Sequence, residues 1–168
     1  MRKVALMVAA VIAFPVTAQE PARPGPEHEQ LKRKEGTWET AMKFGDMVSK
    51  GTAAFKMELG GLWLVGSLES ELLGQKFSGR SMDSYDSTKK KYVSLWFDSM
   101  NTSPVIMEGT YDKEKKTLTM AGAGPGQNGP ATKYKSVTET PDHDTEVMTM
   151  YIGEGKDPGF VMTYKRKK

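Results

Sequence analysis

Apolar and polar residues alternate along most of this chain, in short runs that are separated by turn-forming segments. In the first run, Trp38, Met42 and Phe44 occupy one set of alternate positions, whereas Glu39 and Lys43 occupy the other. Successive side chains of a β-strand point to opposite faces, so this pattern predicts a strand with one apolar and one polar face. Ten strands are predicted in all, at residues 37–44, 48–59, 62–72, 76–85, 91–98, 104–112, 117–123, 132–140, 145–152 and 159–166.

Turn-forming residues separate these strands, as at Gly60-Gly61 and Leu73-Gly74-Gln75. Their spacing of about ten residues is typical of an antiparallel all-β protein and not of βαβ units. Short connections pair sequential strands, which favours an up-and-down meander. We expect the meander to close into one barrel of about ten strands, because closure removes the unpaired strand edges that promote aggregation.

In the last predicted strand, Phe160, Met162 and Tyr164 occupy every second position and form one apolar face. Closure requires this face to lie beside the apolar face of the first strand. A barrel of about eight strands already holds one small ligand, so a wider one is expected to contain a lumen. Methionine and aromatic residues would give this lumen a soft apolar lining. The candidate lumen residues are Met42, Phe44, Leu64, Phe97, Met107, Tyr111, Met150, Met162 and Tyr164.

The inner face of the ninth predicted strand is assigned from its methionines. We place Met148, Met150 and Ile152 inside, and Glu146 and Thr149 outside. With these choices nearly every carboxylate of the chain faces solvent.

The fifth predicted strand offers two possible inner faces. One consists of Val93, Leu95 and Phe97, and the other of Tyr92, Trp96 and Asp98. We favour the aliphatic face inside, with Trp96 partly covered by a short N-terminal helix. This helix is predicted over His28–Glu35, and Gly36 stands where a helix stop is expected.

The N-terminal segment has the features of a secretory signal peptide. Arg2 and Lys3 precede an apolar run over Val4–Val16, and the small residues up to Ala18 offer a cleavage site. The run is shorter than the roughly 20 residues that are needed to cross a bilayer, so we expect no transmembrane anchor. Export to the periplasm or the extracellular space follows from this interpretation.

Three segments result from cleavage near Ala18. They are a signal peptide at 1–18, a proline-rich flexible leader at 19–27, and one barrel domain at 28–168. A chain of this length suits one core. There is no cysteine, so neither a disulfide nor lipid attachment through cysteine is expected.

Net charge argues against nucleic acid as a partner. The full chain has 24 basic and 21 acidic side chains, and loss of Arg2 and Lys3 leaves 22 and 21, a net charge of +1. The lysine clusters lie at predicted turns and at the C-terminus, and they form no basic stripe of the kind that phosphate backbones require.

Two loop motifs resemble functional sequences but lack their context. Residues 124–129 read G-P-G-Q-N-G and match the dinucleotide pattern, yet no βαβ unit surrounds them, so we interpret them as a loop at the barrel rim. His143 lies between Asp142 and Asp144, where a solvated turn is favoured over a weak metal contact or a general base. The other histidine, His28, precedes the barrel.

Two further groups of residues have side chains that could serve as chemical sites. Glu69 and Glu71 share one face of the third predicted strand, and a solvated outer face is favoured over a pair of catalytic carboxylates. The methionines, notably Met148 and Met150, could bind Cu(I), but methionine more often fills a core. We therefore assign no catalytic residue, metal or cofactor.

The segment around Gly36-Thr37-Trp38, after a short helix, resembles the Gly-x-Trp motif of the lipocalin-like (calycin) barrels. A longer series of residues resembles an uncharacterised family of exported bacterial proteins, catalogued as a domain of unknown function, from about Pro26 to Lys165. The series comprises Tyr85-Asp86, Lys90-Lys91-Tyr92-Val93, Trp96, Asp98-Ser99-Met100, Thr102, Glu108 to Asp112 and Lys116 to Thr119. In calycins the first-strand tryptophan packs against a basic side chain near the last strand, which implies that Gly36, Trp38 and Arg166 close the barrel.

These observations lead to three functional hypotheses. The first is an exported lipocalin-like protein that binds a small hydrophobic or amphipathic molecule in its lumen. The second is an envelope interaction or scaffold protein, which an apolar outer patch around Trp63 and Val65 would favour. The third is a hydrolase or isomerase, which would need two titratable groups inside the barrel. The sequence identifies no protein partner.

Overall fold

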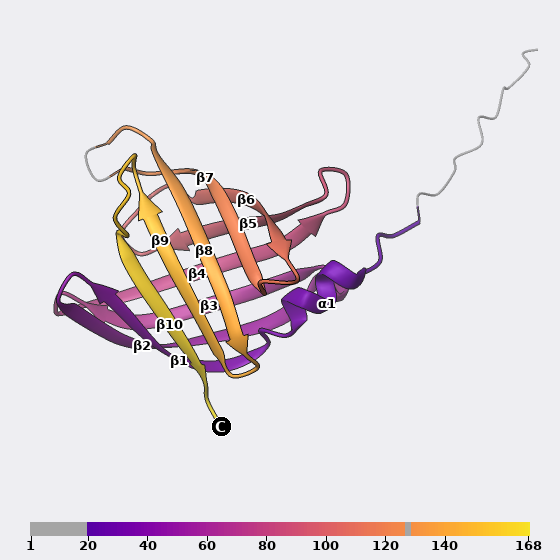
Figure 1. The fold of residues 1–168 in the computed structure, drawn as a ribbon, viewed down its shortest axis with the longest axis horizontal. Coiled ribbons are helices and arrows are strands. Elements are labelled where there is room, and N and C mark those ends of the chain that lie inside the picture. The colour runs from indigo at the N-terminus through magenta and orange to yellow at the C-terminus, as the bar shows by residue number, and fades with distance from the viewer. Residues whose placement is uncertain (1–19, 127–128) are drawn as a thin grey trace, which may run out of the picture.

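The computed structural model describes residues 20–126 and 129–168, which form a closed ten-stranded antiparallel barrel preceded by one short helix (Figure 1). The predicted signal peptide lies outside the described residues, as do Gln127 and Asn128 of the glycine-rich loop. The elements are α1 (Pro26–Lys32), β1 (Gly36–Phe44), β2 (Met47–Glu58), a 3-10 turn (Leu59–Gly61), β3 (Trp63–Leu72), β4 (Gln75–Asp86), β5 (Lys91–Asp98), β6 (Val105–Asp112), β7 (Thr117–Gly124), β8 (Thr132–Asp142), β9 (Thr145–Ile152) and β10 (Phe160–Arg166).

Strand pairing confirms the predicted up-and-down topology. Each strand pairs with its neighbour in sequence, and β1 closes the ring by pairing with β10. The closing register sets Met42 opposite Met162 and Trp38 opposite Arg166. The barrel has two different ends, because α1 packs against β3 and β4 at one end and the β1–β2 hairpin lies at the other (Figure 1). We call these the helix end and the open end.

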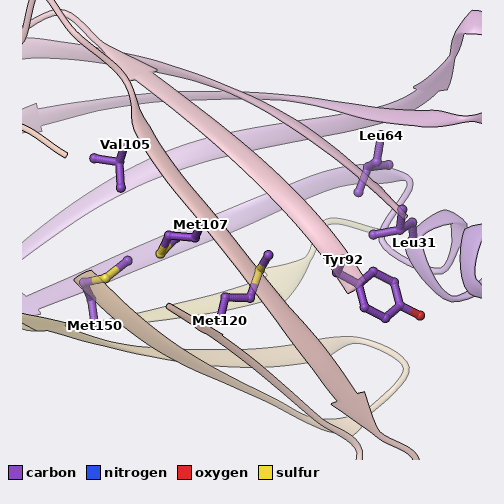
Figure 2. Close-up of a cluster of buried hydrophobic side chains, with 7 residues drawn as sticks. All are labelled: Leu31, Leu64, Tyr92, Val105, Met107, Met120 and Met150. Atoms are coloured by element: carbon purple, nitrogen blue, oxygen red, sulfur yellow. The ribbon is translucent and has the colours of Figure 1, made fainter. Parts of the chain in front are cut away.

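The barrel interior contains two clusters of buried apolar side chains. In the first, shown in Figure 2, Leu31 of α1 meets Leu64 and Tyr92 near the helix end, and the methionines lie farther along the barrel. The second surrounds Trp38, which with Leu64 is almost completely buried. The clusters are Leu31, Leu64, Tyr92, Val105, Met107, Met120 and Met150, and Trp38, Met42, Ala53, Leu68, Met162 and Tyr164.

The helix differs from the prediction in position and in what ends it. It spans Pro26–Lys32, with Gly25 as N-cap and Arg33 as C-cap. Gly36 is therefore not the helix stop but the first residue of β1, with φ of 119°. A Cβ on Gly36 would lie 2.9 Å from Nη1 of Arg166, so glycine makes room for this guanidinium.

The inner face of β5 is also the opposite of the predicted one. Tyr92 and Ser94 are buried and Trp96 packs against both clusters, whereas Phe97 is 40% exposed. Trp96 fits inside because its indole occupies the space over Gly79, where a Cβ would lie 2.2 Å from the ring. The indole stacks with Phe77, and its Nε1 donates a hydrogen bond to the Asp98 carboxylate (3.0 Å).

The helical content of residues 20–126 and 129–168 is small. No helix there has the length and hydropathy that a bilayer crossing requires.

Candidate functional site

Seven of the nine predicted lumen residues face the interior. Six of them are buried core residues, and the seventh, Tyr111, is partly buried. Phe44 has the inward parity of Met42, but it ends β1 at the open end and is 40% exposed. Phe97 lies on the outer face, so its prediction as a lumen residue was wrong, like the predicted inner face of β5. The seven inward residues are Met42, Leu64, Met107, Tyr111, Met150, Met162 and Tyr164.

The connector between α1 and β1 is held by the residues that were expected to close the barrel. The Arg166 guanidinium donates hydrogen bonds to the carbonyls of Arg33 (2.7 Å) and Glu35 (2.6 Å). Trp38 Nε1 donates to the carbonyl of Lys34 (2.9 Å), and the guanidinium lies 4.1 Å from the centre of the Trp38 ring. Three successive backbone carbonyls are thus fixed by two side chains.

This fixed connector directs Lys34 into the end of the barrel. The Lys34 Nζ lies 2.5 Å from Oε2 of Glu146, and the two side chains retain only 21% and 12% exposure. The same ammonium lies 4.7 Å from the ring centre of Phe55 and 4.3 Å from that of Tyr164. One carboxylate and two aromatic rings therefore surround a single cation.

The position of Glu146 corrects the sequence-based assignment. We expected it outside, but it pairs with Tyr164 of β10 and is 9% exposed. Glu146 is two residues from Met148, so the period of a strand puts both on the inner face. The premise that nearly every carboxylate lies outside the barrel is therefore wrong for this residue.

A second carboxylate, Asp83 of β4, also points into the interior. It is paired in register with Leu64 of β3 and Ser94 of β5, both of which are buried. The Ser81 hydroxyl donates a hydrogen bond to Asp83 Oδ2 (2.9 Å). Together with Lys34, Glu146 and Tyr164, Asp83 forms what we call the polar cluster.

Burial and charge act in opposite directions within the polar cluster. Burial raises the pKa of Asp83, although the hydroxyls of Ser94 and Ser81 and the charge of Lys34 oppose this rise. Burial is the largest single effect and lowers the pKa of Lys34, but the charge and hydrogen bond of Glu146, together with Tyr164 and Asp83, raise the pKa overall. Burial also raises the pKa of the Tyr164 hydroxyl. Burial thus disfavours the charged form of the Asp83 carboxylate.

Asp83→Asn should stabilise the fold at neutral pH but not at acidic pH. Because the folded pKa of Asp83 is raised, its contribution to stability is present below the unfolded pKa and is lost as pH rises through the folded one. We expect the stability of the variant relative to the parent to increase between pH 3 and pH 7. Urea unfolding at both pH values measures this, with the exposed Glu39→Gln as control. An equal effect of Asp83→Asn at both pH values would contradict the assignment.

A small cavity lies between α1 and the barrel beside the polar cluster. Its volume is about 70 Å³, and Leu31, Lys34, Leu64, Tyr111 and Glu146 are among its lining residues. Liquid water occupies about 30 Å³ per molecule, so only small groups fit without movement of side chains. A larger depression of about 250 Å³ lies between β2, β3 and β4, but residues such as Lys56, Ser67 and Arg80 place it on the outer face.

The other candidate residues lie away from this interior. Glu69 and Glu71 are exposed on β3, as is His143 in the β8–β9 turn. His28 is buried in α1, where its Nδ1 accepts a hydrogen bond from the Gly25 amide (3.0 Å). Within residues 20–126 and 129–168, no group of three or more His, Cys, Asp or Glu side chains is placed to hold a metal ion.

Sequence reasoning missed Lys34 and Asp83. Lys34 follows the helix and belongs to no strand, so strand periodicity carries no information about it. Asp83 shares the parity of Ser81 and Tyr85 in the predicted strand 76–85, and an alternation count on β4 would have placed it inside.

The solved structures that are similar to this chain include two designed proteins. A fluorescence-activating beta barrel designed de novo has a TM-score of 0.49 and 13% identity, with 82% of this chain and 96% of that chain covered. A redesigned beta barrel has a TM-score of 0.45 and 12% identity, with 83% and 96% covered. No curated protein matches the chain. The family model described as "Protein of unknown function (DUF1579)" matches residues 23–166, and the chain therefore belongs to this family, with a lipocalin-like barrel as its fold.

Proposed function

We propose that this protein is exported and binds a small amphipathic molecule inside the barrel. The polar part of the ligand would lie at the polar cluster, and its apolar part would extend among the methionines toward the open end. One observation carries the proposal: the Lys34–Glu146 ion pair lines a cavity inside an apolar barrel, and Asp83 lies on the same inner face of the barrel. Apolar pockets with a few convergent polar groups are typical of small-molecule sites.

The interior is suited to rearrangement around a ligand. Met107, Met120 and Met150 line the first cluster, and Met42 and Met162 the second. Methionine is unbranched and polarisable, so it fills space in several conformations. A ligand larger than the present cavity would be accommodated by movement of these side chains and not of the backbone ring.

Export is part of the proposal because of the N-terminal sequence. The basic residues Arg2 and Lys3, the apolar run after them and the small residues before Ala18 have the order of a secretory signal. Export would place the barrel where lipids and other amphipathic molecules must be carried through water.

Binding of N-phenyl-1-naphthylamine, a neutral probe that fluoresces in apolar surroundings, tests the proposed function. We expect a saturable fluorescence increase with one site per chain. Met150→Trp should weaken it about tenfold or more, equivalent to about 1.4 kcal/mol, because the larger ring fills the interior. Met107→Phe should act in the same direction with less strain, and Met100→Trp, at a position that is 66% exposed, is the matched control.

The opposite results are equally clear. Folded wild-type protein that gives no saturable signal would contradict a binding interior. Equal affinities of Met150→Trp, Met107→Phe and Met100→Trp would place the probe on the outside of the barrel.

The interaction-protein hypothesis has one observation in its favour, at a place other than the one expected. Trp63 and Val65 are only partly exposed, but exposed apolar side chains gather at the open end. They come from the β1–β2, β3–β4 and β5–β6 connections and the neighbouring strand ends. The residues are Phe44, Met47, Val48, Leu73, Phe97, Met100, Ile106 and Ile152. Leu73→Glu should leave probe binding unchanged if these side chains serve a separate purpose.

A further inference from the structure

We propose that the ligand carries a protonated amine and that Asp83 is the side chain that binds it. This inference rests on the proposed function, and it names the chemical class of the ligand. It is carried by three observations: the charges within the polar cluster, the surroundings of Lys34, and the hydrogen-bond partners of Asp83.

The charges within the polar cluster leave one negative charge uncompensated. Asp83 and Glu146 supply two carboxylates, and Lys34 supplies one ammonium, which is paired with Glu146 at 2.5 Å. In the part of the chain that the structure describes, no basic side chain lies within 4.0 Å of the Asp83 carboxylate. A ligand with one positive charge would bring the cluster to neutrality, whereas a ligand carboxylate would add a second uncompensated charge to a buried site.

The surroundings of Lys34 show how this interior holds an ammonium group. A carboxylate oxygen of Glu146 contacts the Lys34 Nζ, and the faces of Phe55 and Tyr164 lie within 5 Å of it. These are the groups that recognise alkylammonium ligands in general, by charge-assisted hydrogen bonding and by cation–π attraction. The protein thus already uses this chemistry for its own lysine.

Asp83 offers a second carboxylate, which accepts hydrogen bonds from neighbouring hydroxyl groups. The Ser81 hydroxyl donates to Oδ2 and holds the carboxylate in place. The Ser94 hydroxyl also stabilises this carboxylate, and an ammonium that enters along the barrel would add a charged donor to the two neutral hydroxyls. Tyr85 and Tyr92, which form an edge-to-face pair, and Trp96 come from the same part of the wall and supply aromatic surface.

A matched series of eight-carbon ligands tests the inference. Octylamine, octanol and octanoate differ in charge but share one apolar chain, and each is used to displace N-phenyl-1-naphthylamine at pH 7. We expect the apparent affinity to follow the order octylamine, octanol, octanoate, with octylamine at least tenfold ahead of octanoate. In Asp83→Asn the advantage of octylamine over octanol should disappear.

One control variant separates this inference from a general effect of removing a carboxylate. Glu39→Gln removes an exposed carboxylate from the outer face of β1 and should leave the order unchanged. Urea unfolding at pH 7 establishes that each variant is folded before its binding is measured.

Each failure has a distinct meaning. Probe binding with octanoate ahead of octylamine, or with the advantage of octylamine intact in Asp83→Asn, would overturn the assignment of the amine but leave the proposed function standing. Absence of probe binding in the wild-type protein would overturn the proposed function itself.

Discussion

Trp38→Ala is expected to lower the free energy of unfolding by about 3–5 kcal/mol, the range for truncation of a large buried aromatic residue. Trp38 is 1% exposed and packs in the second cluster. Its loss removes the ring on which Arg166 lies and the hydrogen bond that holds the carbonyl of Lys34. Chemical unfolding followed by circular dichroism measures the change.

Trp63→Ala is the matched control for this substitution. Trp63 begins the neighbouring strand β3 and is only partly buried, so its truncation should cost less than half as much. Full stability of Trp38→Ala combined with loss of ligand binding would show that Trp38 lines a binding site and does not close the barrel.

Glu146→Gln is expected to have the second largest effect, a loss of about 2–3 kcal/mol in stability at pH 7. Removing one member of a buried ion pair costs about 3–5 kcal/mol because the other charge is left uncompensated. Lys34 retains 21% side-chain exposure, which allows some hydration and reduces the cost. Urea unfolding at several pH values gives the measurement.

The pH dependence of this effect follows from Lys34. Its folded pKa is raised, so its contribution to stability is present below the ordinary lysine pKa and is lost only as pH rises through the folded value. The difference between Glu146→Gln and the parent should therefore persist at neutral pH and shrink under strongly alkaline conditions.

The double variant Lys34→Met with Glu146→Gln isolates the pairing. If the pair is the cause, the double variant should be more stable than Glu146→Gln alone, since no uncompensated ammonium remains. If the double variant lost as much stability as the two single variants together, each side chain would stabilise the fold through separate contacts.

The barrel could be predicted from the sequence because its information is local and repeated. Alternation in β1 and β10, together with short turns, predicts antiparallel neighbours and a closing pair, and Trp38 opposite Arg166 has the register that closure implies. The predicted inner face was wrong where the two faces of a strand are similarly apolar. In β5 both faces are apolar, and the space that admits Trp96 is created by Gly79 on another strand.

The polar cluster could not be predicted in the same way. Its members come from four places far apart in sequence: the connector after α1, β4, β9 and β10. Glu146 was assigned to the surface because it is charged, although it shares the strand parity of Met148. Lys34 has no strand parity at all, and its position depends on hydrogen bonds from Trp38 and Arg166 to the connector. Such long-range contacts are set by tertiary structure and not by local propensity.

Methionine methyl NMR provides the most direct test that the barrel interior binds ligands. The interior residues Met107, Met120 and Met150 are buried, whereas Met100 lies 66% exposed in the β5–β6 loop. Saturation with octylamine is expected to shift the ¹³C-methyl signals of the interior methionines and leave that of Met100 unchanged. Shifts confined to Met100 and other exposed methionines, with the interior signals unmoved, would contradict a ligand inside the barrel.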